Sequence, residues 1–351
     1  MGALSSIFAI IVGLLFGFII LLLSNPSQAV GGFLTILTGA LTHGMKEIGQ
    51  VLYFATPIIL TGLSVGFAFK TGLFNIGASG QFIVGAFAAI YVGLNFKFLG
   101  SANWVFALLA AFLAGALWAL IPGLLKALCN VHEVISSIMM NYIGMYLVNF
   151  LVAGNSKLFD QLRNQSITVP KNAQIPKMGM DKFFPNSSVN GGFFIAVLFV
   201  IIIYIILNKT TFGFELKAVG FNKDASKYAG INEKRSIILS MAIAGALSGL
   251  GGGLLYLAGS GKHIEVVDVL AAEGFAGISV ALVGLSNPIG ILFAALFIAY
   301  ITEGGFFLQL FDFVPEIIDI IIAVIIYFSA FALIIQSIIR YKRNSKRGGK
   351  V

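Results

Sequence analysis

Charge is scarce in this chain. Only 10% of its 351 residues are Asp, Glu, Lys or Arg, whereas soluble domains carry about 25%. No charged side chain occurs between Met1 and Met45, and none between Val134 and Ser156. Because 58% of the residues are hydrophobic, most of the chain has lipid as its solvent. This composition excludes a soluble enzyme, a disulfide-rich secreted domain and a disordered protein.

Groups that bind metals or nucleotides are also scarce. The single cysteine, Cys129, cannot form an intramolecular disulfide, and the three histidines are too scattered to predict a metal site. No P-loop motif occurs, because Gly261-Lys262 is followed by His instead of Ser or Thr. We therefore expect no catalytic residue, no metal and no cofactor in this chain.

Long apolar runs dominate the sequence. A helix needs about 20 residues to cross about 30 Å of hydrocarbon. The runs predict an all-α fold, a polytopic transmembrane helical bundle of about ten passes that include short or broken helices. Two short runs meet at Asn287-Pro288, which predicts a hairpin or a broken pair. The expected passes are 7–23, 51–69, 78–94, 103–125, 134–152, 193–209, 236–258, 273–286, 287–303 and 316–339.

The two ends of the chain differ from its middle. We interpret 7–23 as a retained first transmembrane helix, although Ser27 and Ala29 would also suit a signal-peptidase site. Residues 29–49 are expected to form an interfacial helix. The expected divisions are 1–50 for these two segments, 51–339 for the membrane core and 340–351 for a basic tail.

Basic residues predict the orientation of the bundle. The tail from Arg340 carries Lys and Arg but no acid, so we place it in the cytoplasm. Counting back through the passes puts both termini and segment 210–235 inside, and segment 153–192 outside. The basic residues of 153–192 oppose this assignment, and the tail decides it. Regions 51–94 and 236–286 then run in opposite directions, which predicts an inverted repeat of the kind found in transporters.

Glycines spaced four apart mark two of the expected helices. Gly62 and Gly66 lie in one, and Gly245, Gly249 and Gly253 lie in another. This spacing puts the glycines on one helix face, where a neighbouring backbone can approach closely. We expect tight helix packing, with a face that slides during gating as the alternative.

Polar side chains interrupt the apolar passes at a few positions. Asn75 and Gln81 lie in the glycine-rich segment 71–81, where irregular backbone at membrane depth requires protein or a water cavity around it. Asn141 lies within a pass, and Glu273 begins a short one, where an acid costs about 2.5–3.5 kcal/mol at the bilayer centre. These four residues are candidates for a substrate route. The alternatives are helix caps and interfacial positions.

A polar, helix-compatible stretch occupies 213–231 in the expected cytoplasmic loop. Apolar residues recur there at helical spacing, which predicts a short amphipathic helix with turns at Gly220 and Gly230. Such a helix is suited to docking in a groove on a partner. The recurring residues are Ala218, Phe221, Ala225 and Tyr228.

Several blocks together resemble the permeases of bacterial ABC importers, in the ribose/branched-chain amino-acid permease superfamily. Within it they are most similar to the nucleoside branch, of the guanosine type. The blocks cover most of the chain beyond residue 50. They are ATPIILTGLSVGFAFKTGLFNIGASGQ (55–81), VHEVISSIMMNYI (131–143), FGFELKAVGFNKDASKYAGI (212–231), GFAGISVALVGLSNPIG (274–290) and VPEIIDIIIAVII (314–326).

The resemblance implies a permease subunit in the bacterial plasma membrane that translocates nucleosides. It implies a second homologous permease, two ATP-binding subunits that hold ATP and Mg, and an extracytoplasmic nucleoside-binding lipoprotein. It also implies a cytoplasmic helix that couples the permease to the ATPase. The matching positions are Gly220, Asn222, Ala225, Tyr228, Ala229 and Gly230.

Other functions remain open at this point. A sister permease would carry a sugar or a branched-chain amino acid. An ion-coupled secondary transporter would work alone and would not need the coupling segment. A channel or a structural membrane protein is a third alternative, which the many glycine breaks disfavour. The sequence does not identify the preferred nucleoside.

Overall fold

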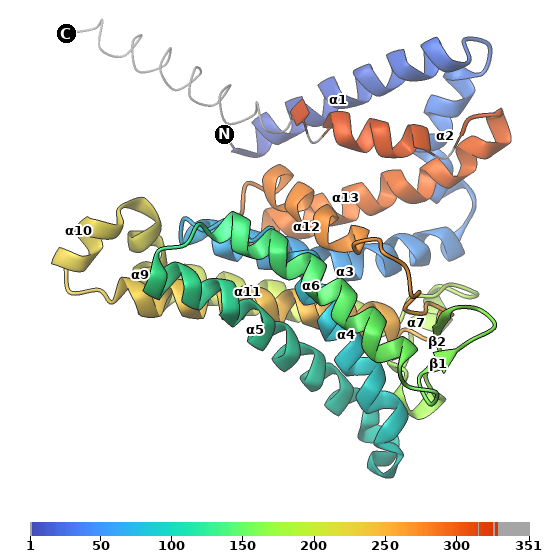
Figure 1. Cartoon of the computed structure of the whole chain (residues 1–351). Helices are drawn as coiled ribbons and strands as arrows, with labels where there is room; N and C mark the ends of the chain where they lie inside the picture. The colour runs from blue at the N-terminus through green and yellow to red at the C-terminus, as the bar shows by residue number, and fades with distance from the viewer. Residues whose placement is uncertain (1, 315, 326, 329–351) are drawn as a thin grey trace, which may run out of the picture.

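The structure is a bundle of long helices with almost no sheet (Figure 1). A computed structural model of the chain describes residues 2–314, 316–325 and 327–328. In this part of the chain, 7 helical segments are long and apolar enough to cross a membrane, which confirms the predicted all-α polytopic bundle. The elements are α3 (Met45–Lys70), α4 (Ala78–Asn95), η1 (Lys97–Ala102) continued by α5 (Asn103–Cys129), α6 (Glu133–Ala153), α8 (Gly192–Lys209), α11 (Glu233–Tyr256), and α13 (Pro288–Phe306) continued by η3 (Phe307–Phe311).

The remaining elements are shorter or lie at the periphery. Two apolar helices precede the core, short helices fill the loops, and two very short strands pair antiparallel. The helices are α1 (Gly2–Ser24), α2 (Ala29–Thr42), η2 (Lys171–Ala173), α7 (Met180–Phe183), α9 (Thr211–Phe221), α10 (Lys223–Tyr228) and α12 (Ala272–Val283), and the strands are β1 (Phe159–Asp160) and β2 (Gln165–Ser166).

The expected break at Asn287-Pro288 is confirmed. Asn287 caps α13, because its Oδ1 accepts a hydrogen bond from the backbone N–H of Ile289 at 3.0 Å, and Pro288 occupies the first turn, where its missing N–H costs nothing. α12 has only 12 residues. The two apolar runs therefore form one short helix and one long helix instead of two full spans.

α11 lies in the middle of the core and packs against α3, α4 and α5. Gly249 of α11 meets the backbone of Gly115 on α5 and of Gly85 on α4, so a Cβ on any of these three glycines would meet backbone atoms. Gly245 and Gly253 also face α5. The absence of side chains at these positions lets three helix backbones approach one another closely.

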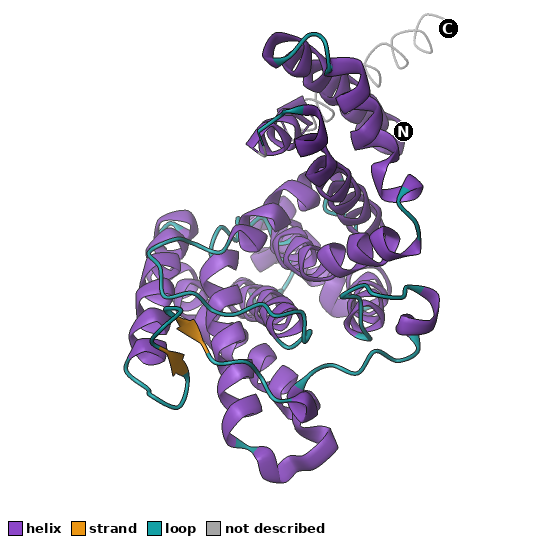
Figure 2. Ribbon diagram, turned by 90° about the vertical axis from the view of Figure 1, so that its right-hand side faces the viewer, coloured by secondary structure: helices purple, strands orange, loops and turns teal. Residues whose placement is uncertain are grey.

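The bundle has two distinct ends. α9 and α10 lie at the left of Figure 1, and the β1–β2 hairpin lies with α7 at the right. We call these the α10 end and the hairpin end. α3 spans the distance between them, since Lys70 meets Gly220 at the α10 end and Gly49 meets Ser187 at the hairpin end. Figure 2 views the hairpin end, where long loops gather over the helix ends.

A smaller group of helices packs beside the core. α1, α2 and residues 317–325 share a buried apolar cluster with the end of α13. α2 ends at Thr42 and α3 begins at Met45, so the expected interfacial segment 29–49 comprises α2 and the first turn of α3. Half of the expected pass 316–339, and all of the tail 340–351, lies outside the described residues.

Candidate functional site

Two helices begin in the interior of the bundle instead of at its ends. Thr61 lies roughly 24 Å from one end of α3 and roughly 14 Å from the other, at 1.5 Å per residue. Its Oγ1 donates a hydrogen bond to the carbonyl of Glu273 on α12 at 3.0 Å. Ser79 on α4 donates to the carbonyl of Ala271 at 2.9 Å. The first turns of α4 and α12 therefore meet at membrane depth, at a place that we call the half-helix junction.

The helices leave this junction in opposite directions. α4 continues to the hairpin end, where Gly93 packs on Val169 and Ala173, and α12 continues toward the α10 end, where Ser286 lies beside Gly66. α3 with α4, and α11 with α12, are thus two pairs of a long helix followed by a helix that starts inside. The pairs run antiparallel, which is the geometry that an inverted repeat requires.

Three of the four predicted route residues form a hydrogen-bonded network at this junction. Asn75 and Gln81 exchange two hydrogen bonds of 2.9 Å, and Asn75 Nδ2 also donates to Ser64 at 3.0 Å. Asn141 of α6 accepts from the N–H of Gly80 at 2.8 Å and donates to the carbonyl of Ile76 at 3.0 Å. The three amides are at most 1% exposed.

These contacts show the local structural role of the three amides. Asn75 does not cap α4, since the N-cap of α4 is Gly77 and has no side-chain hydrogen bond. Instead Asn75 and Gln81 satisfy each other, and Asn141 satisfies backbone groups of the turn before α4 and of the first turn of α4, where all three side chains are buried. Their arrangement holds the turn in shape.

Glu273 is placed differently from the three amides. Its side chain is half-buried, and among the described residues its carboxylate has no hydrogen-bond or ion-pair partner. It lies near Tyr53 and Tyr256, close enough to interact with both electrostatically. Tyr53 shares a 2.7 Å hydrogen bond with Ser260, and the ring of Tyr256 meets that of Phe82 edge to face at 6.4 Å.

Glu273, Tyr53, Tyr256 and Phe82 form a group that we call the aromatic cluster. Aromatic rings offer stacking surfaces, hydroxyls donate and accept hydrogen bonds, and an ionised carboxylate only accepts. Sequence reasoning found Glu273 but missed the three rings, because each lies in an apolar run where an aromatic residue carries no signal. Their proximity arises only from the packing of α3, α4 and α11.

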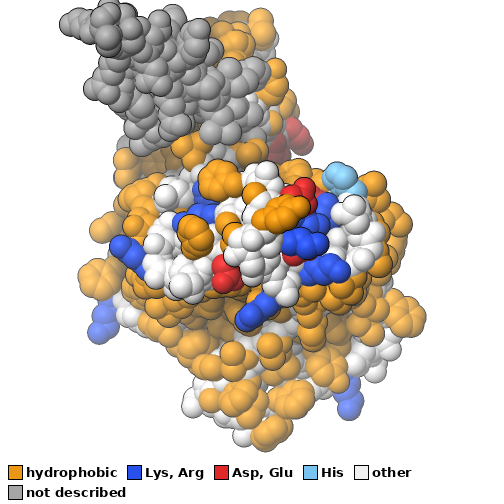
Figure 3. Space-filling model, turned by 90° about the vertical axis from the view of Figure 1, so that its left-hand side faces the viewer, with side chains coloured by type: hydrophobic (Ala, Val, Ile, Leu, Met, Phe, Trp, Pro, Cys, Tyr) orange, Lys and Arg blue, Asp and Glu red, His pale blue; other side chains and the backbone are white. Residues whose placement is uncertain are grey.

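The α10 end exposes two large aromatic side chains. Phe221 is 91% exposed and Tyr228 is 95% exposed. Between them, Asn222 caps α10 by accepting a hydrogen bond from the N–H of Ala225 at 2.9 Å. Figure 3 shows this end, where Lys and Arg side chains outnumber acids among apolar and polar neighbours.

The expected single amphipathic helix between Gly220 and Gly230 is wrong in its boundaries. The segment forms two helices, because Asn222 ends α9 and starts α10. Gly220 is not a turn but part of α9, where its Cα approaches the backbone of Lys70 and Gly72. Gly230 does form a turn, with φ at 82°. Ala225 and Ala229 are exposed, like Tyr228.

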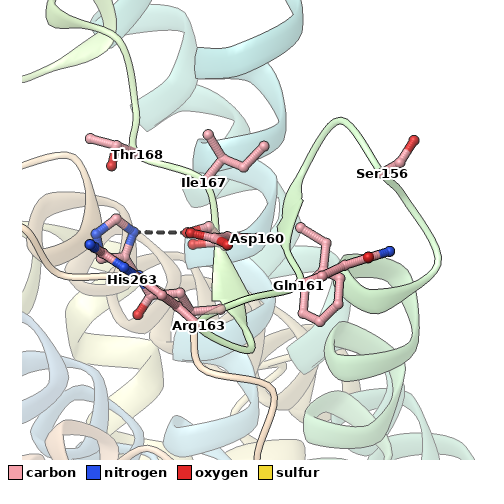
Figure 4. Close-up of a pocket in the computed structure, with 10 residues that line it drawn as sticks. Ser156, Asp160, Gln161, Arg163, Ile167, Thr168 and His263 are labelled. Atoms are coloured by element: carbon pink, nitrogen blue, oxygen red, sulfur yellow. Dashed lines mark hydrogen bonds between the residues drawn. The ribbon is translucent and has the colours of Figure 1, made fainter.

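The hairpin end carries a polar pocket of about 510 Å³ (Figure 4). The loop that forms it is held by hydrogen bonds to the segment before α12. The N–H of Ser166 donates to the carbonyl of Ile264 at 2.8 Å, and Ser166 Oγ accepts from the N–H of Ile264 at 3.0 Å. His263 Nδ1 lies 2.8 Å from the carbonyl of Ser166. Asp160, Arg163 and His263 all line the pocket. Among the described residues, no group of three His, Cys, Asp or Glu could hold a metal ion.

Comparison with known proteins places this architecture in a family. A family model described as the branched-chain amino acid transport system permease component matches residues 47–330. The chain therefore belongs to this family of transport permeases, and it is a multi-pass membrane transport component instead of an enzyme. No solved structure matches the chain.

Individual relatives cover nearly the whole chain. It is 39% identical to the guanosine ABC transporter permease of Bacillus subtilis, over 92% of this chain and 91% of that protein. It is 38% identical to a nucleoside ABC transporter permease of Lactococcus lactis, over 93% and 90%. A glucose ABC transporter permease of Haloferax volcanii is 33% identical, over 80% of this chain and 74% of that protein.

Proposed function

We propose that this chain is the permease subunit of an ABC importer that carries nucleosides across the bacterial plasma membrane, with ATP hydrolysed by a separate subunit. Two relatives at 39% and 38% identity are named for guanosine and nucleoside transport, which supports this cargo. The glucose permease at 33% identity keeps a sugar as the second candidate. The geometric observation that carries the proposal is the exposed aromatic pair at the α10 end.

Phe221 and Tyr228 are suited to docking on an ATP-binding subunit. Large apolar side chains that protrude fully into water indicate a protein partner, and aromatic residues are enriched where partners meet. α10 is short and capped at Asn222, so it is ordered before any partner binds. The proposed coupling positions remain Gly220, Asn222, Ala225, Tyr228, Ala229 and Gly230, with Phe221 added. The ATP-binding subunit supplies ATP and Mg.

The α10 end is the proposed cytoplasmic end. Lys217, Lys223, Lys227, Lys234 and Arg235 lie in or next to α9 and α10, as the positive-inside rule favours. α1 begins on the same side of the bundle (Figure 1), so the N-terminus is proposed to be cytoplasmic, and the basic tail is assigned to that side from its sequence.

The hairpin end then faces outward and is the proposed docking surface for a nucleoside-binding lipoprotein. Its pocket offers Arg163, Asp160 and His263 for polar contacts with such a partner. A second permease of the same family is the further proposed partner. This second partner is supported by Bacillus subtilis, which has a second guanosine permease that is 30% identical to this chain.

The proposed substrate contact is the aromatic cluster beside the half-helix junction. A nucleoside is uncharged, with an aromatic base and a hydroxyl-rich sugar. Tyr53 is 6% exposed, so its ring and that of Tyr256 are proposed to stack on the base only when the bundle opens. The Glu273 carboxylate is proposed to accept hydrogen bonds from a sugar hydroxyl or a base amine. The N-termini of α4 and α12 bring partial positive charge to the same place. Asn75, Gln81 and Asn141 are proposed to shape the route by holding the turn.

The test is uptake of labelled nucleosides and sugars by a strain that lacks this chain, with and without complementation. We expect complementation to restore uptake of a nucleoside but not of glucose. Glu273→Gln should lower nucleoside uptake about tenfold or more while the complex still assembles, since one hydrogen bond to a charged group contributes about 1.5–3 kcal/mol. Restored glucose uptake without nucleoside uptake would establish the sugar alternative.

A further inference from the structure

Two neighbouring pockets lie at the hairpin end, where α5 and α8 enter the membrane. The first is an apolar groove of about 250 Å³ between these helices, and Leu250 of α11 contributes to its lining. The second is a polar pocket of about 350 Å³ under the loop around η2. Trp104, the second residue of α5, lines both. The two pockets thus share a wall at this indole.

The groove has an apolar lining and runs along α5 through one leaflet of the membrane. Its lining side chains are all apolar, from Trp104 and Phe112 on α5 to Ile195 and Phe199 on α8. From Trp104 to Phe112 the helix rises about 12 Å, while one leaflet contributes about half of the 30 Å of hydrocarbon. The groove therefore has the length and the chemistry of a site for one acyl chain.

The polar pocket above it carries positive charge without compensation. Lys171 and Lys177 both line it, together with Asn172, and no Asp or Glu is among its lining residues. Lys177 gives one hydrogen bond to the carbonyl of Ser187 at 3.2 Å, which leaves its other two donors free. Tryptophan at the mouth of the groove is typical of the level at which lipid headgroups lie.

We propose that the groove and the polar pocket together bind one anionic phospholipid from the leaflet at the hairpin end. The acyl chain lies in the groove between α5 and α8, and the headgroup phosphate lies between Lys171 and Lys177. Basic pockets between membrane helices are known to bind anionic headgroups on the cytoplasmic side, and the same charge attraction would act at this end. A helix of a second permease would fill the groove but would leave the two lysines above it without a counter-charge.

The test uses the full chain carrying Trp118→Phe, so that Trp104 is its single tryptophan, in phosphatidylcholine vesicles. A small fixed fraction of the lipid is dibrominated, as phosphatidylglycerol in one sample and phosphatidylcholine in the other. Bromine on an acyl chain quenches a tryptophan that it touches. We expect brominated phosphatidylglycerol to quench Trp104 at least threefold more effectively. If Trp118→Phe fails to insert, the same comparison in the unsubstituted chain serves, with Trp118 as a constant background.

Charge-reversal variants distinguish specific binding of an anionic headgroup from non-specific contact between Trp104 and lipid. Lys171→Glu with Lys177→Glu should remove the preference for phosphatidylglycerol while quenching by phosphatidylcholine persists, which also reports that the groove is intact. Lys157→Glu with Lys182→Glu changes two exposed lysines of the same loop outside the pocket, and it should keep the preference. Equal quenching by both lipids in the parent chain overturns the proposal. Absence of quenching by either lipid also overturns it and assigns the groove to a protein segment.

Discussion

Replacing Gln81 with Leu tests whether the buried amides hold the turn before α4 or line a watery route. The substitution keeps approximate size and removes both hydrogen bonds of 2.9 Å to Asn75. Asn75 keeps its bond to Ser64 at 3.0 Å, but its Oδ1 loses its partner at a position that is 0% exposed. A buried polar atom left without a partner costs about 1–3 kcal/mol, and we expect Gln81→Leu to lower the free energy of unfolding by this amount.

The double variant makes the test sharper. Asn75→Leu alone leaves the buried amide of Gln81 without its partner, so it should lower the free energy of unfolding by a similar amount. When both residues are replaced, no buried amide of this pair lacks a partner. The double variant should therefore lose about 0.5–3 kcal/mol less stability than the sum of the two single losses. The measurement is unfolding in mixed micelles with rising SDS, followed by tryptophan fluorescence.

A matched control and two clear outcomes complete this experiment. Asn95→Leu removes an exposed amide that bonds only the carbonyl of Tyr91, one turn earlier, and it should change stability by less than about 0.5 kcal/mol. Strictly additive costs for Asn75 and Gln81 would show that the two do not act as a pair. Full stability combined with lost uptake would show that the amides face water along the route, and the structural explanation would fail.

Three further predictions concern other parts of the bundle. Phe221→Asp with Tyr228→Asp should leave folding unchanged, since both side chains are exposed, and should lower uptake at least tenfold because ATP hydrolysis no longer drives the permease. In intact cells, an impermeant maleimide should label Leu162→Cys at the hairpin end, where Leu162 is 98% exposed, but not the native Cys129 at the α10 end. Gly249→Leu should abolish folding or cost more than about 3 kcal/mol in a thermal unfolding assay, because the new side chain meets backbone of α5.

Each of these predictions has a control. Phe98→Asp changes an aromatic residue that is 80% exposed at the hairpin end, and it should preserve ATP-driven transport if the α10 end alone couples the two subunits. Leu162→Cys is tested with Cys129→Ser, and labelling of Cys129 from outside would reverse the proposed orientation. Ala153→Leu adds the same side chain at an exposed helix end and should be tolerated; a stable Gly249→Leu would show that the helices have room to separate.

Much of the fold follows from local patterns in the sequence. Apolar runs of sufficient length predict the long helices, since in lipid the backbone must satisfy its own hydrogen bonds. Asn287-Pro288 predicts the start of α13, because the cap and the proline act within one turn. The separation of α9 from α10 at Asn222 also depends on a local signal, because Asn is a favoured N-cap residue. The apolar spacing across Asn222 nevertheless favoured the prediction of one continuous helix.

The junction could not be predicted in the same way. The pairing of Asn75 with Gln81, and the position of Asn141 against the turn, depend on where α6 crosses α4. An amide in an apolar segment is equally compatible with a cap, a route or a network until its neighbours are known. The aromatic cluster depends on contacts between α3, α4 and α11, for which hydropathy and spacing carry no information.

The turn that the amides hold also connects the α10 end to the half-helix junction. At the α10 end, Thr71 shares a 2.8 Å hydrogen bond with Ser240, and Gly72 lies against Gly220 of α9. The chain then passes through Asn75 and reaches Ser79, which bonds to the segment before α12. A displacement of α9 by a docked ATPase would therefore act first on this turn. If the turn is rigid, the displacement would be transmitted to the half-helix junction. A contiguous path of this kind becomes a coupling path only if changes along it alter both functions, so the Gln81→Leu variant bears on transport as well as on folding.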